Sequence, residues 1–244
     1  MKHRNDCYAL LAGDGIDIGA LHEPAPLPAG CRVRYVDAMS RAEAIERFPE
    51  IDHAALVHPD FICNLDRDAL PFPDGALDFV VLSHVIEHVA NPVRVIGEVF
   101  RVLRPGGRAL IAAPDKRFTF DRTRAITPVE TLLEDFLEHR TEVPDERYLD
   151  FLRGAGAHVF DEPPERLPGH VARARSRREH CSVWDSAAFR RFLEASLRAT
   201  GSQADPLVEH PGDETQLEYC GVWEKRAPSL WNRWLKRIGG SRSV

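Results

Sequence analysis

The stretch from Asp78 to Asp121 constrains the fold of this chain more than any other part of the sequence. Phe79 to Leu82 is a short apolar run, which is typical of a parallel strand buried on both faces. Asn91 then supplies a helix cap and Pro92 a first helical residue, and apolar residues follow at helical spacing. A proline-glycine pair suits a type II turn before the next apolar run, residues 109 to 113. The stretch therefore predicts strand, helix, turn and strand.

Similar signals precede this stretch. The segments Gly15 to Ile18 and Val33 to Asp37 have the composition of short strands. Ser40 and Glu43 form a capping box, which predicts a helix over Arg41 to Phe48. The alternation of strands and helices predicts a parallel sheet with helices on both faces, and ligands bind at the carboxyl ends of strands in such sheets.

Three motifs carry a resemblance to a known family. They are Leu70-Pro71-Phe72-Pro73-Asp74-Gly75, Ser83-His84-Val85-Ile86-Glu87-His88 and Leu103-Arg104-Pro105-Gly106-Gly107. In order and spacing they resemble the class I S-adenosylmethionine-dependent methyltransferases. The resemblance implies a Rossmann-like, doubly wound α/β sheet of seven strands, mostly parallel with an antiparallel final strand near residues 216 to 225. It also implies S-adenosylmethionine as cofactor.

The cofactor loop departs from the family pattern. The family follows its first strand with an acidic residue and three alternating glycines, whereas this chain has Asp17-Ile18-Gly19-Ala20-Leu21-His22-Glu23. Only the acid and the first glycine remain, and three prolines between residues 24 and 28 discourage the usual next helix. A non-catalytic binding protein with a degenerate cofactor loop is therefore an alternative hypothesis. A nicotinamide dehydrogenase is disfavoured because no G-x-G-x-x-G follows the strand.

Several residues are candidates for cofactor binding. Asp37 ends the second strand, where a carboxylate accepts hydrogen bonds from ribose hydroxyls. The resemblance suggests Asp66 beside the adenine, with Asn64 and the backbone of Leu65 as competitors. The other predicted cofactor-binding residues are Asp17, Gly19, Ser83 and His84.

His84 and Asp115 are the catalytic candidates. A histidine after the fourth strand suits a general base for a hydroxyl proton, although it also suits support of the cofactor loop. Asp115 follows the fifth strand and is predicted to bind acceptor hydroxyls, with a salt-bridged loop as the alternative. No metal ligand set is assigned. Mg²⁺ is kept as an optional cofactor, with Asp115, Asp121 and Glu87 as the nearest carboxylates.

Residues 115 to 180 interrupt the strand-helix rhythm and are predicted to form an inserted lid that binds the acceptor. Two segments, 15–24 and 114–121, resemble a bacterial subgroup associated with sugar and polysaccharide methylation. That resemblance implies O-methylation of a saccharide, and a small-molecule or quinone-type methyltransferase is the alternative. The candidate acceptor contacts are Phe118, Phe120, Tyr148, His180 and the arginines at 173, 175, 177 and 178.

Composition limits the remaining classes. The chain has 244 residues, enough for a single domain over 1–244, and its net charge of -6 argues against a nucleic-acid partner. No apolar run reaches membrane-spanning length, so we expect a cytoplasmic protein. The five cysteines lack zinc-site spacing. The basic aromatic tail, 227–244, suits contact with a membrane surface, packing on the domain or a homodimer interface.

Overall fold

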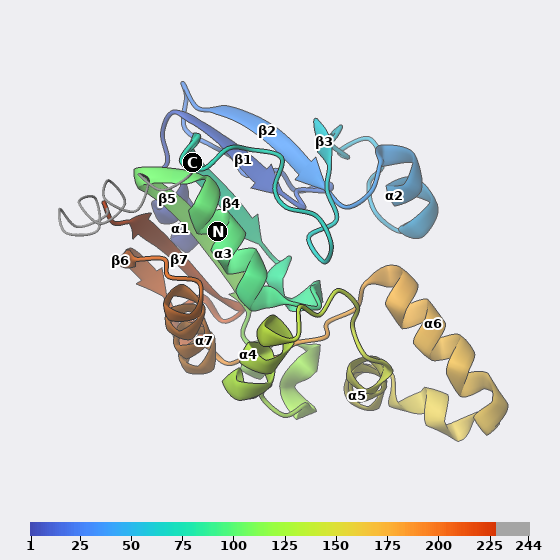
Figure 1. Cartoon of the computed structure of the whole chain (residues 1–244). Coiled ribbons are helices and arrows are strands. Elements are labelled where there is room, and N and C mark those ends of the chain that lie inside the picture. The colour runs from blue at the N-terminus through green and yellow to red at the C-terminus, as the bar shows by residue number, and fades with distance from the viewer. Residues whose placement is uncertain (228–244) are drawn as a thin grey trace, which may run out of the picture.

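The computed structural model describes residues 1–227, which form a seven-stranded sheet in the order β3-β2-β1-β4-β5-β7-β6 (Figure 1). The strands are β1 (Asp14–Ile18), β2 (Arg32–Asp37), β3 (Phe61–Ile62), β4 (Leu77–Ser83), β5 (Leu103–Pro114), β6 (Ala204–His210) and β7 (Glu218–Lys225). The first five strands are parallel, and β7 runs antiparallel to both β5 and β6. The predicted doubly wound sheet with an antiparallel final strand is confirmed.

Eight α-helices surround this sheet within the described residues. They are α1 (Lys2–Tyr8), α2 (Arg41–Arg47), α3 (Pro92–Val102), α4 (Val129–Leu137), α5 (Asp145–Ala155), α6 (Leu167–Arg177), α7 (Ser186–Ala199) and α8 (Gly212–Thr215). Short 3-10 helices are η1 (Ile86–His88), η2 (Lys116–Phe118), η3 (Phe120–Thr123), η4 (Ala157–Asp161) and η5 (Pro164–Arg166). α3 and α7 bury their apolar sides in the main core, whereas α1 packs with a smaller cluster on the opposite face.

Local sequence signals explain where these helices begin. The capping box of Ser40 and Glu43 is formed in full at α2. The Asn91 side chain accepts a hydrogen bond from the Arg94 N–H at 3.0 Å, and Asp185 does the same for α7. α3 ends at Val102, because the following residues are extended and pair with β4 as the start of β5.

The segment 115–180 is built differently from the sheet. α4 packs against α3 and α7, but α5 and α6 lie away from the sheet around a small core of their own (Figure 1). Arg177, at the end of α6, bonds to Glu50 and to the carbonyl of Arg47 beside α2. These polar contacts join the end of α6 to α2 and to the residues that follow it.

Two sequence expectations concern the basic aromatic tail and the lack of a membrane-spanning segment. Residues 228–244, which include almost all of the predicted basic aromatic tail, lie outside the described residues. Among the helices of residues 1–227, none has the length and apolar character needed to span a bilayer.

Candidate functional site

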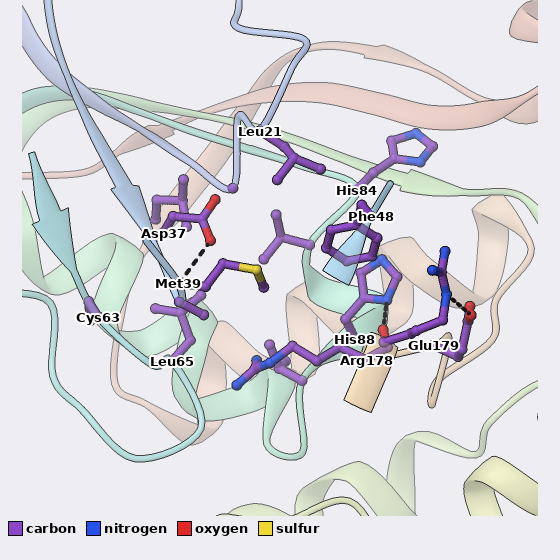
Figure 2. A pocket seen from close by; sticks show the side chains of 16 residues that line it. Leu21, Asp37, Met39, Phe48, Cys63, Leu65, His84, His88, Arg178 and Glu179 are labelled. Carbon is purple, nitrogen blue, oxygen red and sulfur yellow. Dashed lines mark hydrogen bonds and ion pairs between the residues drawn. The ribbon is translucent and has the colours of Figure 1, made fainter. Parts of the chain in front are cut away.

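A cavity of about 270 Å³ opens at the carboxyl ends of β1, β2 and β4 (Figure 2). Asp37 and Met39 border it from the end of β2, while His84 and His88 border it from beyond β4. Its remaining lining residues are Ile18, Gly19, Leu21, Ala38, Phe48, Cys63, Leu65, Val85, Val89, Arg177, Arg178 and Glu179. The cavity is thus mainly apolar, with the carboxylate of Asp37 at the end of β2 and the imidazoles of His84 and His88 beyond β4.

Asp37 is the carboxylate that borders this cavity at the end of β2. Its carboxylate accepts a hydrogen bond from the Met39 N–H at 3.2 Å (Figure 2), and Leu65 lines the same cavity. Burial raises the pKa of Asp37, although backbone hydrogen bonds and the charge of Arg178 oppose that rise. A half-buried carboxylate beside apolar side chains is the environment expected of a ribose-binding acid.

The loop after β1 keeps an unusual backbone although it has lost two glycines. Gly19 has φ 69°, and a Cβ there would lie 2.5 Å from Val85 Cγ2, so only glycine fits. Leu21 stands where the family pattern has its second glycine and still has φ 48°. A leucine in the left-handed region is strained, and such strain concentrates at functional sites. The backbone at position 21 therefore has the left-handed conformation that favours glycine, although the residue is leucine.

A second cavity of about 270 Å³ adjoins the first. Gly19, Leu21 and His84 line both cavities, and Asp17 and Ser83 line the second. The other residues that line it are Met1, Arg4, Tyr8, Ala20, His22, Glu23, Ala25, Val81 and Leu217. His84 thus lies where the two cavities meet.

Asp17 is buried at the end of β1. Its Oδ2 accepts the Ala25 N–H at 3.0 Å, and this contact fixes the irregular chain that replaces a helix after the loop. Burial raises the pKa of Asp17 to about 7, against the effect of that hydrogen bond. A buried carboxyl with one backbone partner is well suited to meet a positively charged group in the second cavity.

His84 forms a pair with a residue far away in the sequence. Its Nε2 lies 2.6 Å from Oε2 of Glu218, which is fully buried at the start of β7 and also accepts hydrogen bonds from His3 and Arg4. Burial lowers the pKa of His84, but the hydrogen bond to Glu218 and the charges of Glu87 and Glu218 outweigh it, so the pKa is raised. His84 also has φ 53°, which aims its side chain from a strained position.

Asp66 and Asp115, two of the predicted site residues, have structural partners. Asp66 accepts the Ala90 N–H at 2.7 Å and pairs with Arg178 at 3.3 Å; it is not among the residues that line either cavity. Asp115 is buried, and Arg117 and Ser186 donate hydrogen bonds to its carboxylate. Asp115 therefore joins β5 to the start of α7 rather than lining the cavities.

The three predicted hard-cation residues do not gather as a group. Asp121 is hydrogen-bonded to His180 at 2.6 Å, and the imidazole of His180 lies next to Glu87. Asp115 has its own partners elsewhere. The carboxylate of Glu87 instead lies near the imidazoles of His88 and His180. The sequence patterns did not predict this group.

Glu218 is the main site residue that sequence reasoning missed. It lies 134 residues from His84 in the sequence and follows no motif. The available signal was a single acidic residue near the start of the predicted antiparallel final strand, residues 216 to 225. Only the three-dimensional pairing of β7 with β5 brings it to the end of β4.

Comparisons with known proteins agree with this geometry. Residues 13–111 match the family described as a methyltransferase domain. A probable S-adenosylmethionine-dependent methyltransferase of Mycolicibacterium smegmatis is 34% identical over 127 residues, covering 51% of this chain and 42% of that protein. Demethylmenaquinone methyltransferase of Thermus thermophilus is 46% identical over 46 residues, covering 19% of this chain and 21% of that protein. The chain thus spans less than half the length of these curated relatives.

Solved structures extend the likeness to nearly the whole chain. A chain of the "complex between the Haloferax volcanii Trm112 methyltransferase activator and the putative methyltransferase" superposes with TM-score 0.50 at 14% identity, covering 93% of this chain and 88% of that one. The fold is that of a class I S-adenosylmethionine-dependent methyltransferase. A protein from Pyrococcus horikoshii gives TM-score 0.50 at 16% identity, covering 92% and 87% of the two chains.

The relative from Mycolicibacterium smegmatis is named as S-adenosylmethionine-dependent, and the linings of the two cavities would fit that cofactor. In the first cavity, Asp37 would offer a carboxylate to the ribose, and Met39 and Leu65 would offer apolar side chains to the adenine. In the second cavity, the buried carboxyl of Asp17 would meet the charged methionine end.

Proposed function

We propose that this chain is an S-adenosylmethionine-dependent O-methyltransferase that acts on a sugar hydroxyl of a saccharide or glycan precursor. The observation that carries the proposal is the pair of His84 and Glu218 at the junction of the two cavities. A base held at that junction stands where the adenosine and methionine parts of the cofactor would meet.

The chemistry of this pair follows from its hydrogen bonds. The bound cofactor supplies an electrophilic methyl group. Because Nε2 of His84 donates to Glu218, Nδ1 is left to accept the hydroxyl proton. Glu218 would then stabilise the imidazolium, and the guanidinium of Arg4, 2.6 Å away, holds that carboxylate in place. The pair therefore supplies both a base and its orientation.

The acceptor side of the proposal rests on Phe120. Its side chain is 53% exposed, and its ring centroid lies 4.8 Å from that of His180. An exposed ring next to buried polar groups suits the apolar face of a sugar ring. Tyr148 does not serve this role, because it is 2% exposed within the small core of α5 and α6.

The arginines of α6 support a lid rather than an anion site. Arg175 bonds to the Val143 carbonyl and to Asp145 within the same segment, and Arg178 bonds to Asn64 near β3. Arg177 and Arg178 also line the first cavity. The segment 115–180 is therefore proposed to cover the cofactor and to complete the acceptor site.

A quinone-type acceptor is the second candidate. Short stretches of this chain match quinone methyltransferases, and a planar ring would also stack on Phe120. We expect label from methyl-labelled S-adenosylmethionine to appear in saccharides when the chain is incubated with separate pools of saccharides, quinols, catechols and amino acids. Label confined to quinols or catechols would replace the sugar assignment, and absence of S-adenosylhomocysteine binding would favour a non-catalytic binding protein.

A further inference from the structure

Glu87 is a buried carboxylate without a hydrogen-bond partner. It lies in η1 and is 1% exposed, and neither Oε1 nor Oε2 has a partner within hydrogen-bond distance. A buried charge is costly unless it is paired or coordinates a metal. The neighbouring backbone makes the position rigid, since the Glu87 carbonyl accepts the N–H groups of Cys181 and Ser182.

Three imidazole nitrogens surround one oxygen of this carboxylate. Oε1 lies 3.7 Å from Nε2 of His88, 3.9 Å from Nε2 of His180 and 3.7 Å from Nδ1 of His84. These separations are too long for hydrogen bonds. Ligands of one tetrahedral metal with bonds of about 2.0–2.1 Å stand about 3.4 Å apart, so the spacing is close to that of a shared ion.

The other ring nitrogens of His88 and His180 are already bonded to acceptors. Nδ1 of His88 lies 2.5 Å from the carbonyl oxygen of Arg178 (Figure 2), and Nδ1 of His180 lies 2.6 Å from Asp121. Arg124 holds that aspartate through a 2.7 Å hydrogen bond. Because these partners only accept, both Nδ1 atoms carry the proton and both Nε2 atoms present lone pairs. Metal-ligating histidines are typically oriented in this way.

We propose that Glu87, His88 and His180 bind a divalent transition metal of the zinc class. One ligand atom from each residue lies within 4.8 Å of the other two, as a single ion requires. Two imidazoles and one carboxylate suit zinc, iron or cobalt rather than magnesium, which prefers oxygen ligands. The site therefore differs in residues and in metal class from a magnesium site built on Asp115, Asp121 and Glu87.

The position of the site gives it a role. Glu87 and His88 belong to η1, which borders the first cavity, whereas His180 follows α6, so the ion would link the end of the lid to the sheet. A three-residue set leaves a coordination position for an oxygen ligand. We identify this ligand as the acceptor hydroxyl beside His84, and this step rests on the proposed function. Metal binding itself does not depend on the proposed function.

The test measures binding without cofactor or acceptor. The full chain, stripped of metals, is titrated with Zn²⁺ by calorimetry, and bound metal is counted after dialysis by mass spectrometry. We expect one tight equivalent, and substitution by Co²⁺ should give a spectrum of imidazole and carboxylate ligation without thiolate bands. Failure of methyl transfer would leave this result unaffected, so the two proposals can fail separately.

Variants then locate the ion. Glu87→Gln keeps the shape of the side chain. Glu87→Gln and His180→Ala should each weaken Zn²⁺ binding at least about 100-fold. Loss of a residue that only supports a ligand weakens metal binding by about 10–100-fold. Asp121→Asn, which replaces the charged acceptor of the His180 N–H by a neutral amide oxygen, should lie in that lower range. The matched control is His170→Ala, which removes a histidine 3.4 Å from Glu162 elsewhere on the lid and should change nothing.

Three outcomes would overturn the proposal. They are no bound zinc, a zinc equivalent that survives Glu87→Gln at full affinity, and preferential binding of Mg²⁺. Circular dichroism of each variant separates loss of a ligand from loss of folding. If His180→Ala does not fold, Glu87→Gln decides alone.

Discussion

The sheet and the segment from 115 to 180 are held together by different means. The strands β1, β2 and β4 contribute apolar residues to the extensive core with α3 and α7 and to the smaller core on the opposite face. The helices α5 and α6 have a small core of their own, and Arg177 and Arg178 bond to residues beside α2 and β3. The comparison predicts that the proposed cofactor site on the sheet is held more firmly than the proposed acceptor site on residues 115–180.

The largest expected effect is at His84, where the two cavities meet. His84→Asn, a residue that tolerates a positive φ, should lower turnover by about 10² to 10⁴-fold because the general base is lost. The affinity for S-adenosylhomocysteine, measured by calorimetry, should stay close to that of the unmodified protein. Equal losses of turnover and affinity would show instead that His84 shapes the cofactor site.

Truncations in the two cores should separate them directly. Ile96→Ala in the fully buried face of α3 should lower the free energy of unfolding by about 2–5 kcal/mol. Leu152→Ala in the core of α5 and α6 should mainly increase hydrogen exchange and proteolysis in residues 115–180, with a smaller change in the global transition. If both variants lower the global transition equally, the two regions unfold as one unit.

Cofactor binding should depend on the sheet side alone. Asp37→Ala should weaken S-adenosylhomocysteine binding at least about tenfold, because a charged hydrogen bond contributes about 1.5–3 kcal/mol. Asp52→Ala, at an exposed aspartate outside the cavity, is the matched control for calorimetric titration. Unchanged affinity in the Asp37 variant would place the ribose elsewhere.

Glu218 should leave a signature in the pH dependence of stability. Burial raises its pKa, but the hydrogen bonds from Arg4 and His84 outweigh it and depress the pKa well below its usual value. The resulting stability is present above the unfolded pKa of about 4.3 and is lost as the pH falls toward the folded value. Between about pH 6 and pH 3, the native protein should therefore lose more free energy of unfolding than Glu218→Gln.

Denaturant titrations over a pH series measure this difference. Glu224→Gln on the same strand changes the net charge equally and serves as the control. Parallel curves for the native protein and Glu218→Gln would show that the carboxylate is not held by Arg4 and His84.

The smallest effect is expected at the polar contact between lid and sheet. Arg177→Met removes its ion pair with Glu50 but keeps much of the apolar stem. Because Glu50 is about half exposed, the loss of global stability should be about 0–1 kcal/mol, while protease sensitivity of α6 should rise. An unchanged digestion pattern would mean that the contact does not hold the lid.

Sequence patterns predicted the elements of the sheet well and the long-range polar contacts poorly, for a physical reason. The capping box at Ser40 and the Asn91-Pro92 helix start are local, so their outcome depends on neighbouring residues alone. The contact of Glu218 with His84 joins residues 134 positions apart, and that of Glu87 with His180 joins residues 93 positions apart. No periodicity records such contacts. Leu21 shows a further limit, since its glycine-like backbone is imposed by the surrounding fold rather than by its own residue type.

The contacts of Glu218 also set an order on folding. The carboxylate reaches His84 only when β7 has inserted beside β5, and the same event binds the first helix through Arg4. During synthesis, the earlier strands emerge from the ribosome before their last neighbour, with His84 still lacking its partner. Assembly of the proposed base is thus delayed until β7 has been synthesised, so a nascent chain would carry an incomplete site until then.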